Sequence, residues 1–357
     1  MTADVRSKRP AWRRIAGLAL RWGLALAVLC FVASNAAKLW DSGQVEHLTI
    51  DPLWLIASGM AYTLGWLPSV WFMRRLLSES GHRVSPLSVA RAYYCGHLGK
   101  YVPGKATVVL IRAVMLRDRG VPFGAGALAT VAETLAMMGT GLALTLAIAT
   151  YALPDAAWQK LPASLLWLRD SPGFVTLAVV LLTLVTVPTV TGFAGRIAGR
   201  LAQKSLAARQ ADTPAAQQLD DSDNGSAADN WTLKLSAGLL IQALLVFCGA
   251  WYLMGLSLLC VLNAIAEPAF SFNRWLICTA AATGGTSIGF FVLIAPGGLG
   301  IREGLIFATI SPLVGAPLAG AASILLRGVW FASEIGISAV LYLLPGRRLQ
   351  SPETGDQ

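Results

Sequence analysis

Hydrophobic residues gather in long segments, and polar residues are concentrated in the stretches between them. Six segments are long enough to cross a bilayer, because about 20 apolar residues span the hydrocarbon core. The six predicted spanning helices are Ile15–Ala37, Pro52–Leu77, Pro122–Leu153, Gly173–Phe193, Leu233–Leu262 and Pro317–Leu344.

Two further apolar segments are interrupted by proline and glycine. Pro86–Arg112 is broken at Pro103–Gly104, and Arg274–Val314 is broken within the glycine-rich run Ile294–Gly304. Proline lacks the N–H donor, and glycine costs about 1 kcal/mol per helical position, so neither run continues a helix. Irregular backbone is not tolerated against lipid, so each break must be buried in protein or line a wet cavity. We expect two re-entrant helical hairpins; the alternative is that each broken segment forms two full spans.

The positions of the basic residues predict the orientation of these segments. Residues 1–14 are basic, Arg74 and Arg75 end the second span, and Arg347 and Arg348 follow the last one. Because basic flanks stay in the cytoplasm, both termini are expected there. The two hairpins then enter from opposite sides. In chain order the segments read span, span, hairpin, span twice, and because three spans is an odd number, the second set is inverted relative to the first.

The predicted fold is therefore an all-α polytopic protein of the cytoplasmic (inner) membrane, built from two inverted repeats. The stretch Arg196–Asn230 has low hydrophobicity and is first basic, then acidic, which is typical of a disordered linker. The expected divisions are a basic cytoplasmic tail (1–14), a first membrane repeat (15–194), a flexible cytoplasmic linker (195–230), a second membrane repeat (231–346) and a cytoplasmic tail (347–357).

Composition supports the membrane class and excludes several functions. The chain is 55% hydrophobic and 13% charged, against roughly 25% charged residues in soluble domains. The net charge of +9 does not indicate nucleic-acid binding, because the basic residues lie at segment ends without interleaved aromatics. Five cysteines without CxxC spacing and three dispersed histidines predict no metal site. No Walker A pattern is present, so we expect no cofactor and no ATP hydrolysis.

Three charged residues lie well inside predicted spans, away from both ends of the span. Glu133 and Arg327 occupy matching positions, ten to eleven residues into the span that follows each break, and Glu334 lies two turns beyond Arg327. A charge at this depth costs about 2.5–3.5 kcal/mol. One explanation is an internal ion pair, Glu133–Arg327 or Arg327–Glu334, that holds the halves together. The other is a polar cavity between the halves that these charges line.

Further basic residues accompany the first break. Lys100, Lys105 and Arg112 either orient the segment or hold a phosphate at the cytoplasmic mouth, where helix N–H groups add affinity for anions.

These motifs carry a resemblance. Tyr101-Val102-Pro103-Gly104 followed by Arg112, and Ala295–Glu303 followed by Leu325-Leu326-Arg327, resemble the membrane domain of lysylphosphatidylglycerol synthetases. The resemblance covers most of the chain and implies a flippase-like role. In the synthetases a separate C-terminal domain makes the aminoacylated lipid. The sequence ends at Gln357, so we expect that transferase activity to be absent.

The expected function is transport of an anionic phospholipid or lipid-linked headgroup between leaflets, with membrane lipids as partners and no catalytic residues. Arg327 would pair with the phosphate at mid-depth, and Arg302 would receive or deliver the headgroup at the outer side. The candidate substrate-binding residues are Arg327, Arg302, Glu303, Glu133, Glu334, Lys100, Lys105, Arg112, Pro103, Gly104, Pro296, Gly297, Gly298 and Gly300.

Two alternatives stay open. The chain is either an accessory membrane subunit that positions a lipid-modifying synthase, or an integral-membrane transferase. For a transferase, His97 with Asp118 is the available pair, and its spacing matches no known catalytic arrangement.

Overall fold

A computed structural model describes residues 50–101, 106–152, 170–211, 233–291 and 300–344, and every regular element in these ranges is a helix. The elements are α2 (Pro52–Gly65), α3 (Leu67–Glu79), α4 (Pro86–His97), the 3-10 turn η1 (Leu98–Tyr101), α5 (Ala106–Arg117), α6 (Phe123–Ala152), α9 (Pro172–Ala211), α10 (Ala237–Ile265), α11 (Phe272–Phe291), α12 (Ile301–Val314) and α13 (Ala316–Leu343).

Five helical stretches in the described ranges are long and apolar enough to cross a membrane, which confirms the polytopic, all-α membrane class. They are Pro52–Glu79, Phe123–Tyr151, Pro172–Arg200, Ala237–Ile265 and Ala316–Leu343, and each corresponds to one predicted span. The sixth predicted span, Ile15–Ala37, lies outside the described residues, as do the tails 1–14 and 347–357.

Local sequence signals start several of these helices. Asp51 accepts a hydrogen bond from the Leu53 amide at 2.9 Å and caps α2. Ser85 and Ser236 cap α4 and α10 in the same way, each accepting from a backbone amide at 3.2 Å. Such caps satisfy N–H groups that the helix leaves unpaired.

The second predicted span is confirmed as the stretch Pro52–Glu79. It consists of two helices, because Pro68 provides no amide for the Leu64 carbonyl and the helix is interrupted at Trp66. The linker prediction for 195–230 is wrong in its first part, since α9 continues to Ala211. Low hydrophobicity indicates only that a segment leaves the bilayer; it does not end a helix.

The helices on either side of the first break are short. α4 and α5 have 12 residues each, about 18 Å, which is too short to cross about 30 Å of hydrocarbon. This length fits a re-entrant hairpin. α11 has 20 residues, enough to cross by length alone, so the re-entrant geometry of the second segment stays a prediction.

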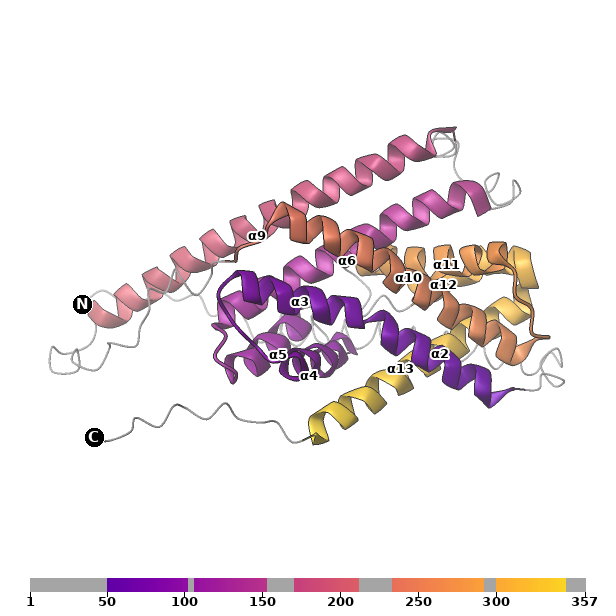
Figure 1. Cartoon of the computed structure of the whole chain (residues 1–357), viewed down its shortest axis with the longest axis horizontal. Coiled ribbons are helices and arrows are strands. Elements are labelled where there is room, and N and C mark those ends of the chain that lie inside the picture. Colours follow the sequence, from indigo (N-terminus) through magenta and orange to yellow (C-terminus); the bar gives the residue numbers. More distant parts are fainter. Residues whose placement is uncertain (1–49, 102–105, 153–169, 212–232, 292–299, 345–357) are drawn as a thin grey trace, which may run out of the picture.

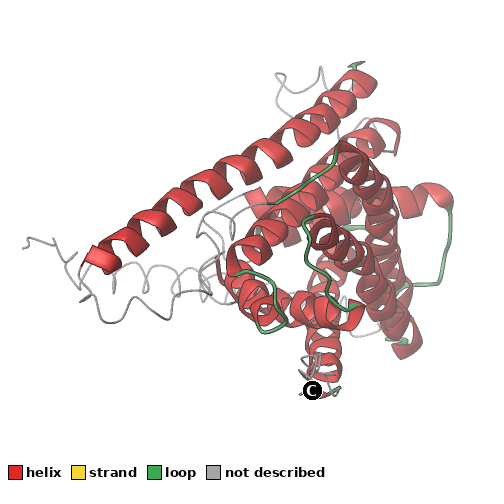
Figure 2. Cartoon of the chain, turned by 60° about the vertical axis from the view of Figure 1, so that its left-hand side comes forward, coloured by secondary structure: helices red, strands yellow, loops and turns green. Residues whose placement is uncertain are grey.

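Helix α10 lies at the centre of the bundle and packs on α2, α11 and α6, whereas α9 packs mainly on α6 and projects beyond the other helices (Figures 1 and 2). Of the five spans, α10 is the most buried and α9 the least. α10 and α11 approach closely at Gly255, where a Cβ would lie 2.5 Å from the Thr279 Cα. Here only glycine fits between the two backbones.

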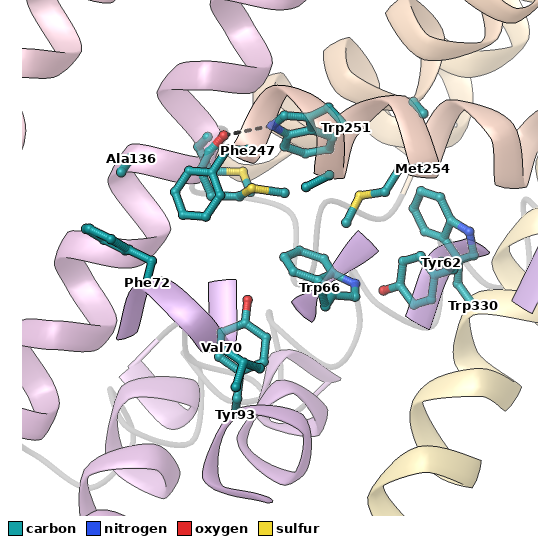
Figure 3. Close-up of a cluster of buried hydrophobic side chains, with 14 of the residues drawn as sticks. Tyr62, Trp66, Val70, Phe72, Tyr93, Ala136, Phe247, Trp251, Met254 and Trp330 are labelled. Carbon is teal, nitrogen blue, oxygen red and sulfur yellow. Dashed lines mark hydrogen bonds between the residues drawn. The ribbon is translucent and has the colours of Figure 1, made fainter. Parts of the chain in front are cut away.

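Aromatic side chains fill the interior between α2, α10 and α13 (Figure 3). The Tyr62 and Trp330 rings stack with centroids 4.5 Å apart. The Trp330 indole N–H donates to the Ser257 hydroxyl at 2.9 Å, and that of Trp251 donates to the Met137 carbonyl at 3.0 Å. Because buried tryptophans need such partners, these bonds fix both the depth and the rotation of α10.

Contacts between the predicted halves occur in matched pairs. α6 of the first half packs on α11 of the second, α13 of the second packs on α4 of the first, and α2 and α10 pack on each other. Two halves related by a two-fold axis would exchange contacts in this way. The inverted repeat itself stays a prediction, and this exchange supports it.

Candidate functional site

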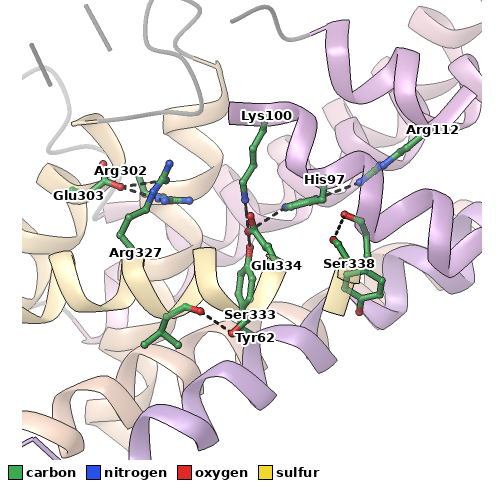
Figure 4. A network of polar contacts seen from close by, with 12 residues as sticks. Tyr62, His97, Lys100, Arg112, Arg302, Glu303, Arg327, Ser333, Glu334 and Ser338 are labelled. Carbon is green, nitrogen blue, oxygen red and sulfur yellow. Dashed lines mark hydrogen bonds and ion pairs between the residues drawn. The ribbon is translucent and has the colours of Figure 1, made fainter. Parts of the chain in front are cut away.

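A row of charged side chains crosses the interior where α4, η1 and α5 meet α12 and α13 (Figure 4), and Glu133 of α6 extends it beyond Arg112. At one end Arg112 donates to Glu133 with an Nη1–Oε2 distance of 3.1 Å, and both side chains are 2% exposed. The Tyr93 hydroxyl donates to the other Glu133 oxygen at 3.0 Å. The Arg112 guanidinium also lies over the Tyr93 ring, 3.7 Å from its centroid. This pair is buried, and of the Arg112 nitrogens Nε has no hydrogen-bond partner among the described residues.

At the centre of the row, Lys100 pairs with Glu334, which also accepts a hydrogen bond from the Tyr62 hydroxyl. Glu334 is 2% exposed and Lys100 is 19% exposed. Lys100 comes from η1 beside the first break, whereas Glu334 comes from α13. The contact therefore joins the two predicted halves. Ser338, one turn along α13, donates to the Tyr94 carbonyl at 3.0 Å and fastens the same seam.

His97 connects these two pairs. Its Nδ1 lies 3.3 Å from Arg112 Nη2, and its Nε2 lies 3.8 Å from Glu334 Oε1. The imidazole also packs on Trp66, with ring centroids 4.5 Å apart. Both ring nitrogens thus face charged groups, so His97 links the Arg112–Glu133 pair to the Lys100–Glu334 pair.

At the other end, one carboxylate serves two arginines. Glu303 Oε1 lies 3.2 Å from Arg302 Nη2 and 3.5 Å from Arg327 Nη1. The second oxygen of Glu303 accepts from the Gly300 amide at 2.8 Å, at the start of α12. Gly300 has φ of +83°, a conformation that favours glycine, which explains a glycine at this helix start.

Tyr101 lies between Lys100, beside the first break, and Arg327, which pairs with Glu303 after the second break. Its ring centroid is 5.2 Å from Lys100 Nζ and 5.2 Å from Arg327 Cζ. Tyr101 directly precedes the first break, and Arg327 contacts the carboxylate that caps the helix after the second. Arg327 therefore connects the residues beside the two breaks, as expected of paired interrupted segments at one site.

Cations outnumber carboxylates in this row. Among the described residues it contains four basic side chains, Lys100, Arg112, Arg302 and Arg327, and three acidic ones, Glu133, Glu303 and Glu334. The excess falls at Arg302 and Arg327, which share one partner. The most exposed members are Lys100 at 19% and Arg327 at 17%.

Both ion pairs predicted from the sequence are wrong. Glu133 pairs with Arg112, and Arg327 pairs with Glu303, so neither Glu133–Arg327 nor Arg327–Glu334 forms. A charge has several possible partners within one helical turn, and the sequence does not fix how helices rotate against each other. The suggested pair of His97 with Asp118 is also wrong, because Asp118 is exposed and His97 faces Arg112 and Glu334.

The site contains aromatic residues that the sequence reasoning missed. These are Tyr62, Tyr93, Tyr101 and Trp330, which bond to or stack on the charged groups. Tyr101 adjoins the first motif and could have been found there, whereas nothing in the sequence distinguishes Tyr62 from other aromatics in spans. Of the predicted site residues, Pro103, Gly104, Lys105, Pro296, Gly297 and Gly298 lie outside the described residues.

In the described ranges, no group of three or more His, Cys, Asp and Glu side chains is placed to hold a metal ion. The row contains arginines from the consecutive helices α12 and α13, aromatic neighbours and side chains of limited exposure.

Comparison with known proteins identifies the family. The model for the lysylphosphatidylglycerol synthase TM region matches residues 12–335. The chain belongs to this family. The match confirms the resemblance read from the two motifs and indicates a membrane role related to lipids. No curated protein matches the chain.

Proposed function

We propose that this member of the lysylphosphatidylglycerol synthase TM region family moves an anionic phospholipid between leaflets, with the phosphate passing Arg302 and Arg327. One observation carries the proposal. Two arginines from α12 and α13 share a single carboxylate, although both lie in the interior of a membrane protein. A buried charge needs a partner, so this arrangement leaves capacity for a second anion.

The chemistry of the two side chains favours phosphate. A guanidinium presents several N–H donors in a plane and binds phosphate oxygens in pairs. Arg327 has one hydrogen-bond partner among the described residues, Glu303 at 3.5 Å, and is 17% exposed. Among the described residues, most of its donors therefore have no hydrogen-bond partner and could bind a ligand, while the acyl chains of a lipid could stay among the apolar helix surfaces.

Family membership supports a transport role over a catalytic one. The TM region of the synthases is typically their flippase-like, non-catalytic part, and the described residues bring no nucleophile and base together at this site. We also infer from the charge pattern that the chain resides in the inner membrane with both termini in the cytoplasm.

The test is lipid movement in liposomes that contain the purified full chain. Headgroup-labelled phosphatidylglycerol and phosphatidylcholine are followed by chemical quenching of the outer leaflet. We expect the wild type to move the anionic lipid faster, and the double variant Arg302→Gln/Arg327→Gln to lose this movement. Arg117→Gln, an exposed change at the end of α5, is the control and should transport normally.

Three outcomes would contradict the proposal. No movement of any lipid would favour an accessory subunit, equal movement of both lipids would exclude phosphate selection, and full activity of the double variant would place the path elsewhere.

A further inference from the structure

We infer that the Glu303 carboxylate is a resident counter-anion, which occupies in the unloaded protein the place between Arg302 and Arg327 that a lipid phosphate takes during transport. The inference rests on the proposed function. It assigns Glu303 a role as a displaceable partner, distinct from that of a residue that binds the headgroup.

The contacts of Glu303 with Arg302 and Arg327 are long and share one oxygen. One oxygen, Glu303 Oε1, serves both guanidinium groups at 3.2 and 3.5 Å. Charge-assisted bonds between these groups are normally about 2.7–2.9 Å, and arginine commonly binds carboxylates through two oxygens. Neither arginine has this geometry here, so an anion with more oxygens would bind both of them better.

Glu303 keeps one hydrogen bond when it is displaced from the arginines. Its other oxygen accepts from the Gly300 amide at 2.8 Å. This bond lies at the N-terminus of α12, where the helix dipole also favours a carboxylate. Glu303 can therefore release both arginines, keep one good hydrogen bond, and return when the phosphate leaves.

Glu303 is also more exposed than the other two carboxylates of the row. Glu133 and Glu334 are each 2% exposed, whereas Glu303 is 11% exposed. Glu133 accepts from both Arg112 and Tyr93. The Arg112 contact to Glu133 is shorter and less exposed than either arginine contact of Glu303, so Glu303 is displaced more easily than Glu133.

An exchangeable anion also suits transport. Two buried guanidinium groups without a partner would be costly, and a phosphate held by both without competition would leave slowly. Conduction requires a site that binds well enough to be entered and weakly enough to be left. Competition from Glu303 lowers the net affinity for the phosphate and speeds its release.

The test is equilibrium binding of radiolabelled phosphatidylglycerol to the purified full chain in detergent, together with transport in liposomes. Glu303→Gln keeps an acceptor for the Gly300 amide but removes the competing charge. We expect binding to tighten about tenfold and the maximal transport rate to fall, because release slows. Glu267→Gln, which changes an exposed glutamate, is the matched control and should bind as the wild type does.

A purely structural role predicts the opposite sign. If Glu303 only positions the two arginines, Glu303→Gln should weaken binding, and that result, or unchanged binding, would overturn the inference. Should Glu303→Gln fail to elute as a single species, Glu303→Asp replaces it, because the shorter side chain withdraws the charge from the arginines. It is expected to shift binding in the same direction, and weaker or unchanged binding in Glu303→Asp would likewise overturn the inference.

The outcomes also separate this inference from the proposed function. A wild type that binds phosphatidylglycerol but does not move it would contradict transport, while the binding shift in Glu303→Gln would still support the exchange. A wild type that transports, combined with unaltered binding in the variant, would contradict only the exchange.

Discussion

Replacing Arg112 with alanine should destabilise the protein strongly. The substitution removes the 3.1 Å contact to Glu133 and the stacking on Tyr93, and it leaves the Glu133 charge in a place that is 2% exposed. Breaking a buried pair by removing one partner costs about 3–5 kcal/mol. The hydrogen bonds from Tyr93 and Thr134 remain, at 3.0 and 3.3 Å, and they keep the expected loss near the lower end of that range.

The measurement is unfolding of the purified chain in mixed micelles of mild detergent and dodecyl sulfate, followed by circular dichroism. Arg117→Ala, at the exposed end of the same helix, controls for the loss of an arginine and should be neutral. Arg112→Ala/Glu133→Gln should recover part of the loss, because no buried charge then lacks a partner. Stability of Arg112→Ala within about 1 kcal/mol of wild type, or no recovery in the double variant, would show that this pair does not hold the fold.

Three further predictions follow from the site and the packing. Arg327→Lys should leave unfolding unchanged yet reduce anionic-lipid transport by about tenfold or more, since lysine cannot replace the planar fork; wild-type transport, or an equal loss in Arg117→Lys, would contradict this. Gly255→Ala should lower the free energy of unfolding by about 1–3 kcal/mol through overpacking. Gly249→Ala, where the added Cβ meets nothing within 4 Å, should be tolerated. Equal melting temperatures of the two variants would refute the close approach of α10 and α11. A phosphatase active only outside the cytoplasm should be inactive when fused after Leu344, and activity there would overturn the proposed orientation.

The sequence is sufficient to predict the five spans that the structure describes and the helix ends on either side of the two breaks, because both follow from local chemistry. About 20 apolar residues must cross the bilayer, and proline with several glycines must end a helix. The interruption before Pro68 has the same cause, since this proline also lies inside an apolar segment. The continuation of α9 to Ala211 could not be found from hydrophobicity, since polar residues also form helices.

The pairing inside the site could not be predicted in the same way. Hydrophobic flanks indicate that Glu133 and Glu334 are buried, and they are. Their partners depend on how distant helices rotate and tilt. Lys100 and Glu334 are 234 positions apart, and the sequence contains no sign of their contact. Glu303 illustrates the limit. It stands next to Arg302 in sequence, yet its link to Arg327 depends on the packing of α12 on α13.

The distance along the chain between Lys100 and Glu334 has a consequence for biogenesis. At about 5–20 residues per second, synthesis of the intervening 234 positions takes about 12–47 s. Throughout that interval the segment that contains Lys100 has entered or approached the membrane. Glu334, the partner of this lysine, has not yet been synthesised. A charge at depth is costly, so the unfinished first half should stay near the interface or the insertion machinery until α13 arrives. Completion of the last helix, rather than insertion of the first ones, then commits the chain to its final fold.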